Sequence, residues 1–428
     1  MIYSLMALVL AGNTLYAQQG GGASAQLTQL IGKAMDNYPK LKEGQEYIKL
    51  GEARTELAYA GYMPVIGAEA TYRYQQPTPK IVIPIPGFES SIQFIPANNY
   101  DFNIKLSQPV WDFGRTQASV NKAKSETATA KDNVEASKNN VAYQVAQLYY
   151  GIIFLNKSID VQNEQVKLLE ANEKLISDKI KNGDGLKFDL LSTQVKKNAA
   201  TNRIVDLQTQ LKKQYDVLNM LTANTGYDYI TQRDADATTF SATTVTPDNN
   251  FDIKLLQDRL TSASWDIKAA KRGWLPSINL SAQAGYKNGF VPDINKLTFN
   301  YGVGVGLNVP IYGANRPNYQ TKIAKINMQA NTYALEAQKI TLNKDIMLAQ
   351  NDIAASEEKL KNYELQIKQA DEALTLANAR YKSGVITNLE LLTSQTNQQD
   401  AMLGKIQLEY NLLLAKLELN RLGAVKFW

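Results

Sequence analysis

The sequence KNGDGLKFDLLSTQ at residues 181–194 interrupts a long run of helix-forming residues, and KSGVITNLELLTSQ at residues 382–395 interrupts a second run in the same way. Each stretch places a glycine after a basic helix end and follows it with a leucine-rich segment. Because glycine has no Cβ, it can adopt a positive φ angle and end a helix without strain. The two stretches therefore predict two long helices that each turn into a second helix, one at Gly183 and one at Gly384.

The chain contains two copies of one structural unit. AGYMPVIGAEATYRY (60–74) resembles RGWLPSINLSAQAGY (272–286), and QPVWDFGRTQASVNKAK (108–124) resembles VPIYGANRPNYQTKIAK (309–325). From Arg115 to Gly183 is 68 residues, and from Arg316 to Gly384 is also 68 residues. A repeat of matched landmarks at matched spacing indicates a structural duplication.

The repeat sets the predicted domain organisation. A signal peptide is predicted at 1–17, the first repeat at 26–222, a polar linker at 223–250 and the second repeat at 251–424. The signal peptide is predicted from an apolar run of about ten residues that ends in small and polar residues.

Each copy carries two predicted strands between its helices. In 65–74 and in 301–309, apolar residues alternate with small or polar ones. This alternation over about ten residues fits a membrane strand with one face in lipid and one in a lumen, and it also fits a strand of a soluble sandwich. The first copy carries about 11 more residues between its strands than the second, within the proline-rich stretch 77–96, which predicts an exposed loop.

The long helices carry apolar positions that repeat every seven residues. One seam in the second copy is formed by Leu360, Tyr363, Ile367, Ala370, Leu374, Ala377 and Tyr381. The first copy has two offset series, Val161, Leu168 and Leu175 in one and Leu169 and Ile176 in the other. Two seams on one helix require neighbours on both sides, so the helices are predicted to form a sheet or a tube.

If the strands span a membrane, their number predicts the oligomeric state. Four strands cannot close a membrane barrel, and open strand edges do not occur in lipid. Three chains would supply twelve strands, so a homotrimer is expected.

Composition excludes several classes of function. The 428 residues include 46 basic and 41 acidic residues and neither histidine nor cysteine. Thiol nucleophiles, imidazole bases and the usual zinc sites are absent, so we expect no catalytic residues, no metal and no cofactor. The net charge of +5 is spread along the chain, which does not indicate a nucleic-acid partner. After the first residues, no run of 18 apolar residues predicts a transmembrane helix.

With these features the chain resembles the outer-membrane efflux protein family, the TolC-like channels. The resemblance is carried by GYMP and GWLP before the first strand of each copy, by QPVWDFG and VPIYGAN after the second, by both glycine breaks, and by the ending LELNRLGAV. It implies a trimer with a twelve-stranded β-barrel in the outer membrane and a long α-helical tunnel in the periplasm. It also implies two partners, a periplasmic adaptor and an inner-membrane transporter.

The resemblance assigns roles to the glycine breaks. They would be periplasmic hairpin tips that dock the adaptor, formed by Gly183, Asp184, Gly185, Leu186, Gly384, Val385, Ile386 and Thr387. A periplasmic gate would include Asp189 and Glu390, each six residues after its tip glycine, and Tyr381, three residues before Gly384.

Two readings of these gate residues stay open. The family's arginine and second acid are replaced by Ile386 and Thr393 here, which puts the usual closing network in doubt. Asp189 and Glu390 could instead be solvated acids in the first turn of a helix, where negative charge suits the helix dipole. Tyr381 also fits the heptad seam.

The sequence thus predicts a mainly α protein with membrane β-strands that serves as the outer-membrane exit duct of a tripartite efflux system for small molecules. A duct for type I protein secretion is the alternative, and a soluble coiled-coil scaffold is a further one.

Overall fold

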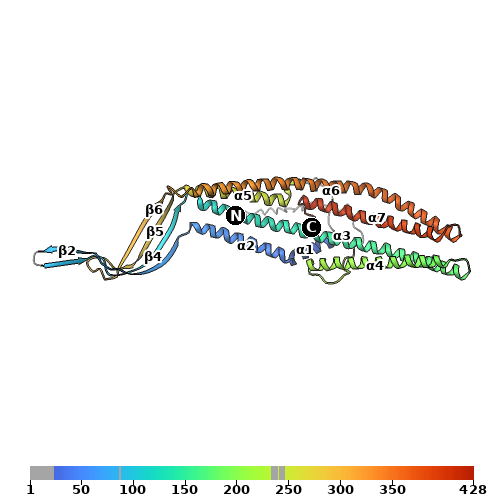
Figure 1. Cartoon of the computed structure of the whole chain (residues 1–428), viewed down its shortest axis with the longest axis horizontal. Helices are drawn as coiled ribbons and strands as arrows, with labels where there is room; N and C mark the ends of the chain where they lie inside the picture. The colour runs from blue at the N-terminus through green and yellow to red at the C-terminus, as the bar shows by residue number, and fades with distance from the viewer. Residues whose placement is uncertain (1–23, 86–87, 233–239, 241–245) are drawn as a thin grey trace, which may run out of the picture. The chain divides into compact units, whose positions relative to one another are not determined.

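The computed structural model describes residues 24–85, 88–232, 240 and 246–428. In chain order its helices and strands are α1 (Ala25–Asn37), α2 (Pro39–Tyr59), β1 (Val65–Tyr74), β2 (Lys80–Ile85), β3 (Phe88–Gln93), β4 (Asn98–Trp111), α3 (Arg115–Lys181), α4 (Lys187–Thr222), α5 (Phe251–Lys271), β5 (Ser277–Lys287), β6 (Thr298–Asn308), α6 (Arg316–Lys382) and α7 (Asn388–Leu422). Short 3-10 turns η1 (Ala60–Tyr62), η3 (Pro247–Asn249) and η4 (Arg272–Trp274) precede β1, α5 and β5. Figure 1 shows this order along the chain. The predicted signal peptide lies outside the described residues, as does part of the predicted linker.

The two long helices have the predicted equal length. Helices α3 and α6 each contain 67 residues, and each is followed by a shorter helix after its glycine. Among the described residues, no helix combines the length and the apolar character needed to cross a membrane.

The chain divides into two compact units. The strand unit contains the described residues of 42–134 and 251–338, and the tip unit contains the described residues of 24–41, 135–250 and 339–428. Both long helices pass from the strand unit into the tip unit, which explains why each unit is assembled from distant parts of the sequence.

The strand unit holds a four-stranded antiparallel sheet in the order β1-β4-β5-β6, as the four predicted strands require. Its register places Glu69 opposite Asn103, and Ala70 opposite Phe102. Because side chains alternate along a strand, one face carries polar or small residues and the other carries apolar ones. Large apolar side chains such as Tyr301 (78% exposed) and Val303 (74% exposed) on β6 have little protein cover.

The insertion in the first copy is more ordered than predicted. Within 77–96, strands β2 and β3 form a separate antiparallel hairpin, with Ile81 opposite Ile92. From the sequence, an exposed loop without these two strands was predicted here, because the prolines outweighed the alternating β-formers in KIVIPI. Pro84 is tolerated because each strand of a two-stranded hairpin has one edge whose amides need no partner.

The helices of the strand unit follow the same lateral order as its strands. Helix α2 packs on α3 where Gly51 meets Thr127, and α3 contacts α5 through an ion pair of 2.8 Å between Lys122 and Asp266. Next to α5, the Trp274 ring nitrogen donates to the side chain of Asn318 on α6 at 3.1 Å. The order is therefore α2-α3-α5-α6, so β1 and α2 form one lateral edge and β6 and α6 form the other.

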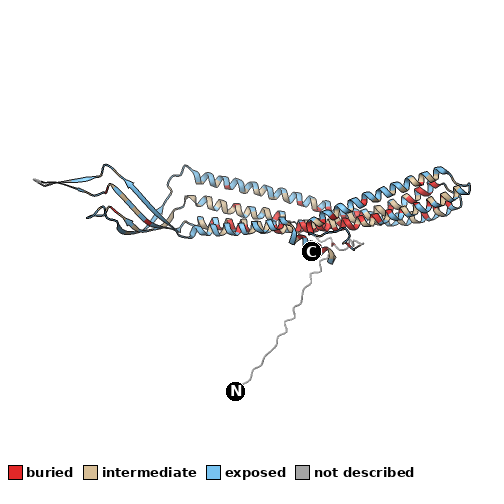
Figure 2. Cartoon of the chain, turned by 90° about the horizontal axis from the view of Figure 1, so that it is seen from below, coloured by how far each residue is buried: buried red, intermediate tan, exposed pale blue. Residues whose placement is uncertain are grey.

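The main hydrophobic core lies in the tip unit. It joins α1, α3, α4 and α7 and includes the fully buried Leu27, Tyr149, Leu218 and Leu413. In Figure 2 buried residues gather in the helices, while the strands are largely exposed.

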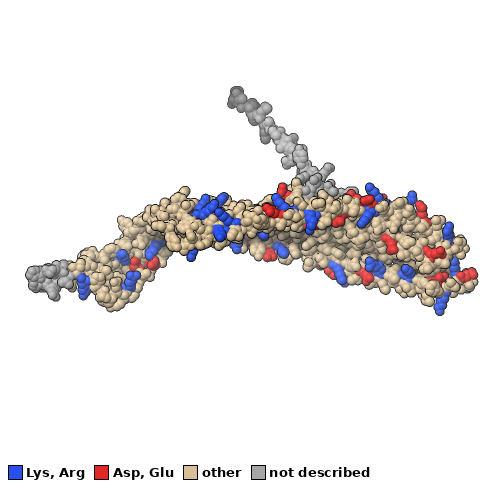
Figure 3. Space-filling model, turned by 45° about the horizontal axis from the view of Figure 1, so that its top comes forward, with Lys and Arg blue, Asp and Glu red and all other residues tan. Residues whose placement is uncertain are grey.

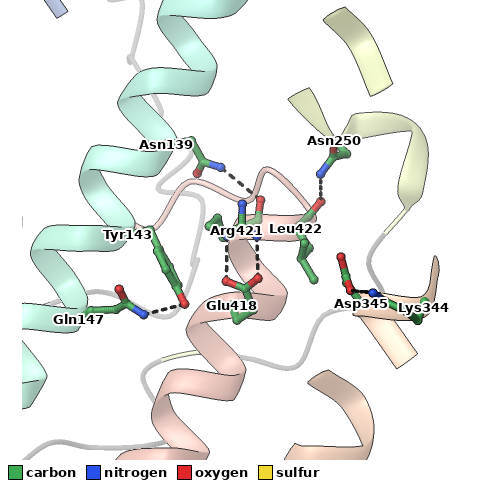
Figure 4. A network of polar contacts seen from close by, with 9 residues as sticks. All are labelled: Asn139, Tyr143, Gln147, Asn250, Lys344, Asp345, Glu418, Arg421 and Leu422. Atoms are coloured by element: carbon green, nitrogen blue, oxygen red, sulfur yellow. Dashed lines mark hydrogen bonds and ion pairs between the residues drawn. The ribbon is translucent and has the colours of Figure 1, made fainter. Parts of the chain in front are cut away.

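The end of α7 is fixed to α3 by polar contacts, shown in Figure 4. Asn139 donates to the carbonyl of Arg421 at 3.2 Å, and Asn250 donates to the carbonyl of Leu422 at 2.9 Å. Arg421 also pairs with Glu418 and lies 5.4 Å from the centre of the Tyr143 ring. Burial, and then the nearby Glu418 carboxylate, raise the pKa of the Tyr143 hydroxyl. These amides satisfy carbonyls that a helix end leaves without partners.

Candidate functional site

The two glycine tips share one backbone geometry. Gly183 donates its N–H to Ile180 O at 3.1 Å, and Asp184 donates to Lys179 O at 2.9 Å. At the second tip Gly384 donates to Tyr381 O at 3.1 Å, and Val385 donates to Arg380 O at 2.9 Å. Both sets of bonds form a Schellman motif, in which the residue after the helix has a positive φ.

Positive φ explains the glycines at both tips. The φ angle is 87° at Gly183 and 75° at Gly384, and no atom would contact an added Cβ at either residue within 4 Å. The requirement for glycine is therefore one of backbone conformation. At Gly185 an added Cβ would lie 2.6 Å from the backbone nitrogen of Ile180, so this glycine is required for space.

The second tip begins its ascending helix with a capping box. Thr387 accepts from the N–H of Glu390 at 3.2 Å, and the Glu390 carboxylate accepts from the N–H of Thr387 at 2.7 Å. These two bonds satisfy donors that the start of α7 would otherwise leave free. The first tip has Leu186 at the matching position, without a side-chain cap.

A small apolar cluster lies behind the tips. Ile176 of α3, Leu374, Ala377 and Tyr381 of α6, and Leu391 of α7 are buried together, with Ile386 packed against them. The predicted heptad seam in α6 is therefore confirmed at its last three positions, and Leu169 and Ile176 are buried as the second series in α3 predicts.

Tyr381 links the two hairpins. Its carbonyl accepts from the ammonium group of Lys179 at 3.2 Å, and the same ammonium group lies 4.3 Å from the centre of the Tyr381 ring. Burial, and then the charge of Asp189, raise the pKa of the Tyr381 hydroxyl.

A buried asparagine forms the second link. Asn388 at the start of α7 accepts from Asn172 of α3 at 2.9 Å. It donates to Thr193 Oγ1 at 3.1 Å and to Asp189 O at 3.3 Å, both on α4. Since Asn388, Asn172 and Thr193 are each at most 5% exposed, this network is shielded from water. The structure thus brings Asp189, Tyr381 and both tips into one assembly.

The two candidate acids are placed differently. Asp189 lies in the first turn of α4 and contributes its carbonyl to the asparagine network. The Glu390 carboxylate is engaged as a helix cap, and hydrogen bonds from the Thr387 N–H and hydroxyl lower the pKa of Glu390. Their role in a gate stays a prediction, and so does adaptor docking at the tips.

The chain matches the model of the outer membrane efflux protein family over residues 30–224 and 246–424. It belongs to this family. It is 22% identical to "Toxin and drug export protein A" of Aggregatibacter actinomycetemcomitans, over 92% of this chain and 84% of that protein. It is 21% identical to "Outer membrane efflux protein BepC" of Brucella suis biovar 1, over 96% of this chain and 87% of that protein.

A solved structure has the same fold. The structure of CusC superposes with a TM-score of 0.81 at 17% identity and covers 96% of this chain and 95% of that one. The combination of long helices and membrane strands expected of a TolC-like channel is confirmed. This outer membrane efflux protein is therefore an outer-membrane channel component rather than a member of an enzyme family.

The sequence reasoning missed the residues that join the two hairpins of this efflux protein, namely Lys179, Asn172, Thr193 and Asn388. One signal was available for Asn172. It stands midway between Leu169 and Ile176, at a heptad position that is normally apolar, so it needs a buried polar partner. Nothing local to Asn388 marks it, because the matching residue of the first copy is Lys187.

Proposed function

We propose that this chain forms the homotrimeric exit duct of a tripartite efflux system and passes small molecules from an inner-membrane transporter and a periplasmic adaptor to the exterior. The observation that carries the proposal is the pair of tips. Two helical hairpins end in the same Schellman motif and are joined by Asn388 and Lys179. A partner with a repeated helical hairpin could dock on both tips in the same way.

The free lateral edges support the trimer. Strands β1 and β6 are the outer strands of the sheet and run in opposite directions, so β1 of one copy can pair antiparallel with β6 of the next. Twelve strands from three copies would then close without an open edge.

Apolar stripes on the edge helices support the same interface. On α6, the exposed Tyr319, Ile323, Ile326 and Tyr333 follow heptad spacing and are between 58% and 62% exposed. On α2, Tyr47, Leu50 and Leu57 are also exposed. Exposed stripes of this kind mark contact surfaces between helices.

The test substitutes the tip glycines Gly183 and Gly384 and measures transport. In cells deleted for this chain, the wild-type protein should restore efflux of a fluorescent dye, and Gly183→Pro or Gly384→Pro should abolish efflux without loss of trimer in the outer membrane. The control is Thr209→Ala, at an exposed position of α4, and this variant should transport normally. Normal efflux by both tip variants would contradict the proposal.

Protein secretion is the second candidate, because the name of one relative includes toxin as well as drug export. The same cells distinguish the two candidates. Retention of a secreted protein in the deleted strain, with dye efflux unchanged, would assign the duct to secretion.

A further inference from the structure

A basic surface surrounds the junction of helices and strands in the strand unit. The stretches 113–125, 267–276 and 309–335 together contain nine lysines and arginines and no aspartate or glutamate. The chain as a whole is nearly balanced in charge, so this absence of acids is a local property. Figure 3 shows Lys and Arg side chains gathered near the strand end of the helices.

Five lysines of this surface are exposed, and we call them the lysine collar: Lys124, Lys268, Lys271, Lys322 and Lys325. Lys124 and Lys268 lie over the rings of Tyr59 and Trp265, at 5.3 and 3.6 Å from the ring centres. In the described part of the chain none of the five forms an ion pair. Their charge is therefore available to a partner outside the chain.

The collar lies on one side of the wall of helices. On α3, Thr127 faces α2 and Ser125 faces α5. At 100° per residue, Lys124 points between these directions to one side, whereas Lys122, which pairs with Asp266, points to the other. On α5, Lys268 lies about 200° around the helix from Asp266 and points to the side of Lys124, while Lys271, at about 140°, points toward α6 at the edge of that side. On α6, Pro317 packs against Gly273 at the end of α5, which puts Lys322 and Lys325 on the side of Lys124.

The handedness of the backbone identifies that side. Gln75 follows β1 directly and alternates in step with the polar-face residues Thr71 and Arg73. Its N–H donates to Ala97 O, just before β4. The polar-face residues of β1 therefore also direct their N–H groups toward β4. For L-amino acids this places β4 to the right of β1, viewed from the polar face with β1 pointing up. In the same view the helices keep the left-to-right order α2-α3-α5-α6, and α3 runs downward. Because α3 is right-handed, Lys124 then points away from the viewer, to the side that continues the apolar face of the sheet.

The apolar face must contact lipid in an outer-membrane protein, so the collar lies just below the lipid that surrounds the sheet. Lys124 is nine residues into α3, which is about 14 Å along the helix. A lysine side chain can extend toward the membrane while its charge stays in water. Exposed aromatic residues lie between the collar and the strands, among them Trp111 at the end of β4 and Tyr312 before α6.

We propose that the lysine collar binds anionic phospholipid headgroups of the periplasmic leaflet. Clustered lysines next to interfacial aromatic residues fit phosphate-bearing lipids, which they attract within a Debye length. The collar would hold the barrel at a fixed depth and orient the tunnel along the membrane normal. The proposal rests on the outer-membrane location of the family and is independent of adaptor docking at the tips.

The test counts lipids on the purified full-length channel. Protein in detergent is mixed with equal amounts of dioleoylphosphatidylglycerol and dioleoylphosphatidylcholine, and retained lipids are counted by native mass spectrometry. Wild type should prefer the anionic lipid, and the preference should fall about fivefold when all five lysines become glutamine, and also in 0.5 M salt.

Two controls separate charge from folding. The variant with all five lysines changed to arginine should keep the preference, and Lys359→Gln with Lys361→Gln, on α6 in the tip unit, should not change it. An unchanged preference in the five-glutamine variant, at the same oligomeric mass, would overturn the proposal. Loss of adaptor binding in that variant with lipid preference intact would also overturn it and assign the collar to a protein partner.

Discussion

Asn388 at the start of α7 and Asn172 in α3 are joined by a hydrogen bond of 2.9 Å, and their side chains are only 2% and 5% exposed. An apolar pair would pack here without needing a partner, whereas two buried amides are stable only when they meet. The bond therefore fixes one relative position of the two hairpins.

Removing this bond should loosen the tips. Asn388→Ala leaves the buried Asn172 amide without its hydrogen-bond acceptor, which costs about 1–3 kcal/mol per chain, while Thr193 keeps its bond to Asp189 O. In planar lipid bilayers the variant channel should show longer or larger openings than wild type. Asn163→Ala, at an exposed position of α3, is the control and should conduct as wild type does. Equal conductance of wild type and Asn388→Ala would show that this bond does not hold the tips closed.

The tip glycines should differ in their tolerance of alanine. At Gly183 and Gly384 the cost is backbone strain of about 1 kcal/mol, because space for a Cβ is available. At Gly185 a Cβ would meet the backbone of Ile180 at 2.6 Å, so the tip must change shape.

Dye efflux by the three alanine variants measures this difference. Gly183→Ala and Gly384→Ala should retain partial efflux, and Gly185→Ala should lose most of it. The reverse order would mean that tip shape around Gly185 is unimportant for transport.

Much of this architecture follows from local sequence. The strands at 65–74, the equal long helices and the seam at Leu374, Ala377 and Tyr381 were predicted because period two and period seven report which face is covered. The duplication predicted that both tips would be alike. The links between the hairpins could not be predicted, because Asn388, Thr193 and Asn172 are far apart in sequence and meet only through tertiary packing.

Glu390 should act as a helix cap in a pH-dependent way. Hydrogen bonds from Thr387 lower the pKa of Glu390, so the cap contributes stability at pH values above the ordinary carboxyl pKa. This contribution is lost as pH falls through the lowered pKa of the folded state. Glu390→Gln can keep the reciprocal bonds of the capping box, whereas Glu390→Ala cannot.

A measurement of ion selectivity distinguishes a helix-capping role of Glu390 from a role in the gate. Reversal potentials of Glu390→Gln channels should stay close to those of wild type if capping is the main role. A clear loss of cation selectivity would instead assign Glu390 to the constriction of the pore.

A carboxyl pair between α3 and α5 should make stability depend on pH. Burial, and then the neighbouring Asp132, raise the pKa of Asp258 to about 6 from an ordinary value of 3.8. Between these two pH values the folded protein holds a proton that the unfolded chain releases, so stability falls as pH rises from about 4 to about 6.

Asp258→Asn removes this dependence. The variant should melt at a higher temperature than wild type at pH 7.5, and the difference should vanish at pH 4. The gain should be at most about 1 kcal/mol per chain, because the Asp258 side chain is only partly buried and solvent screens part of the interaction. Asp248→Asn, on an exposed turn, should have no such effect. If the difference in melting temperature between Asp258→Asn and wild type is the same at pH 7.5 and at pH 4, the two carboxyls do not interact.

Crosslinking at the two tips can capture the periplasmic partner directly. Because the chain has no cysteine, a single cysteine at Asp184 or Ser383 can carry a photo-crosslinker in intact cells, with Thr209→Cys on α4 as the control position. We predict that both tip positions capture a periplasmic adaptor and that the control position does not. Correctly assembled channels that capture no adaptor from either tip would contradict it.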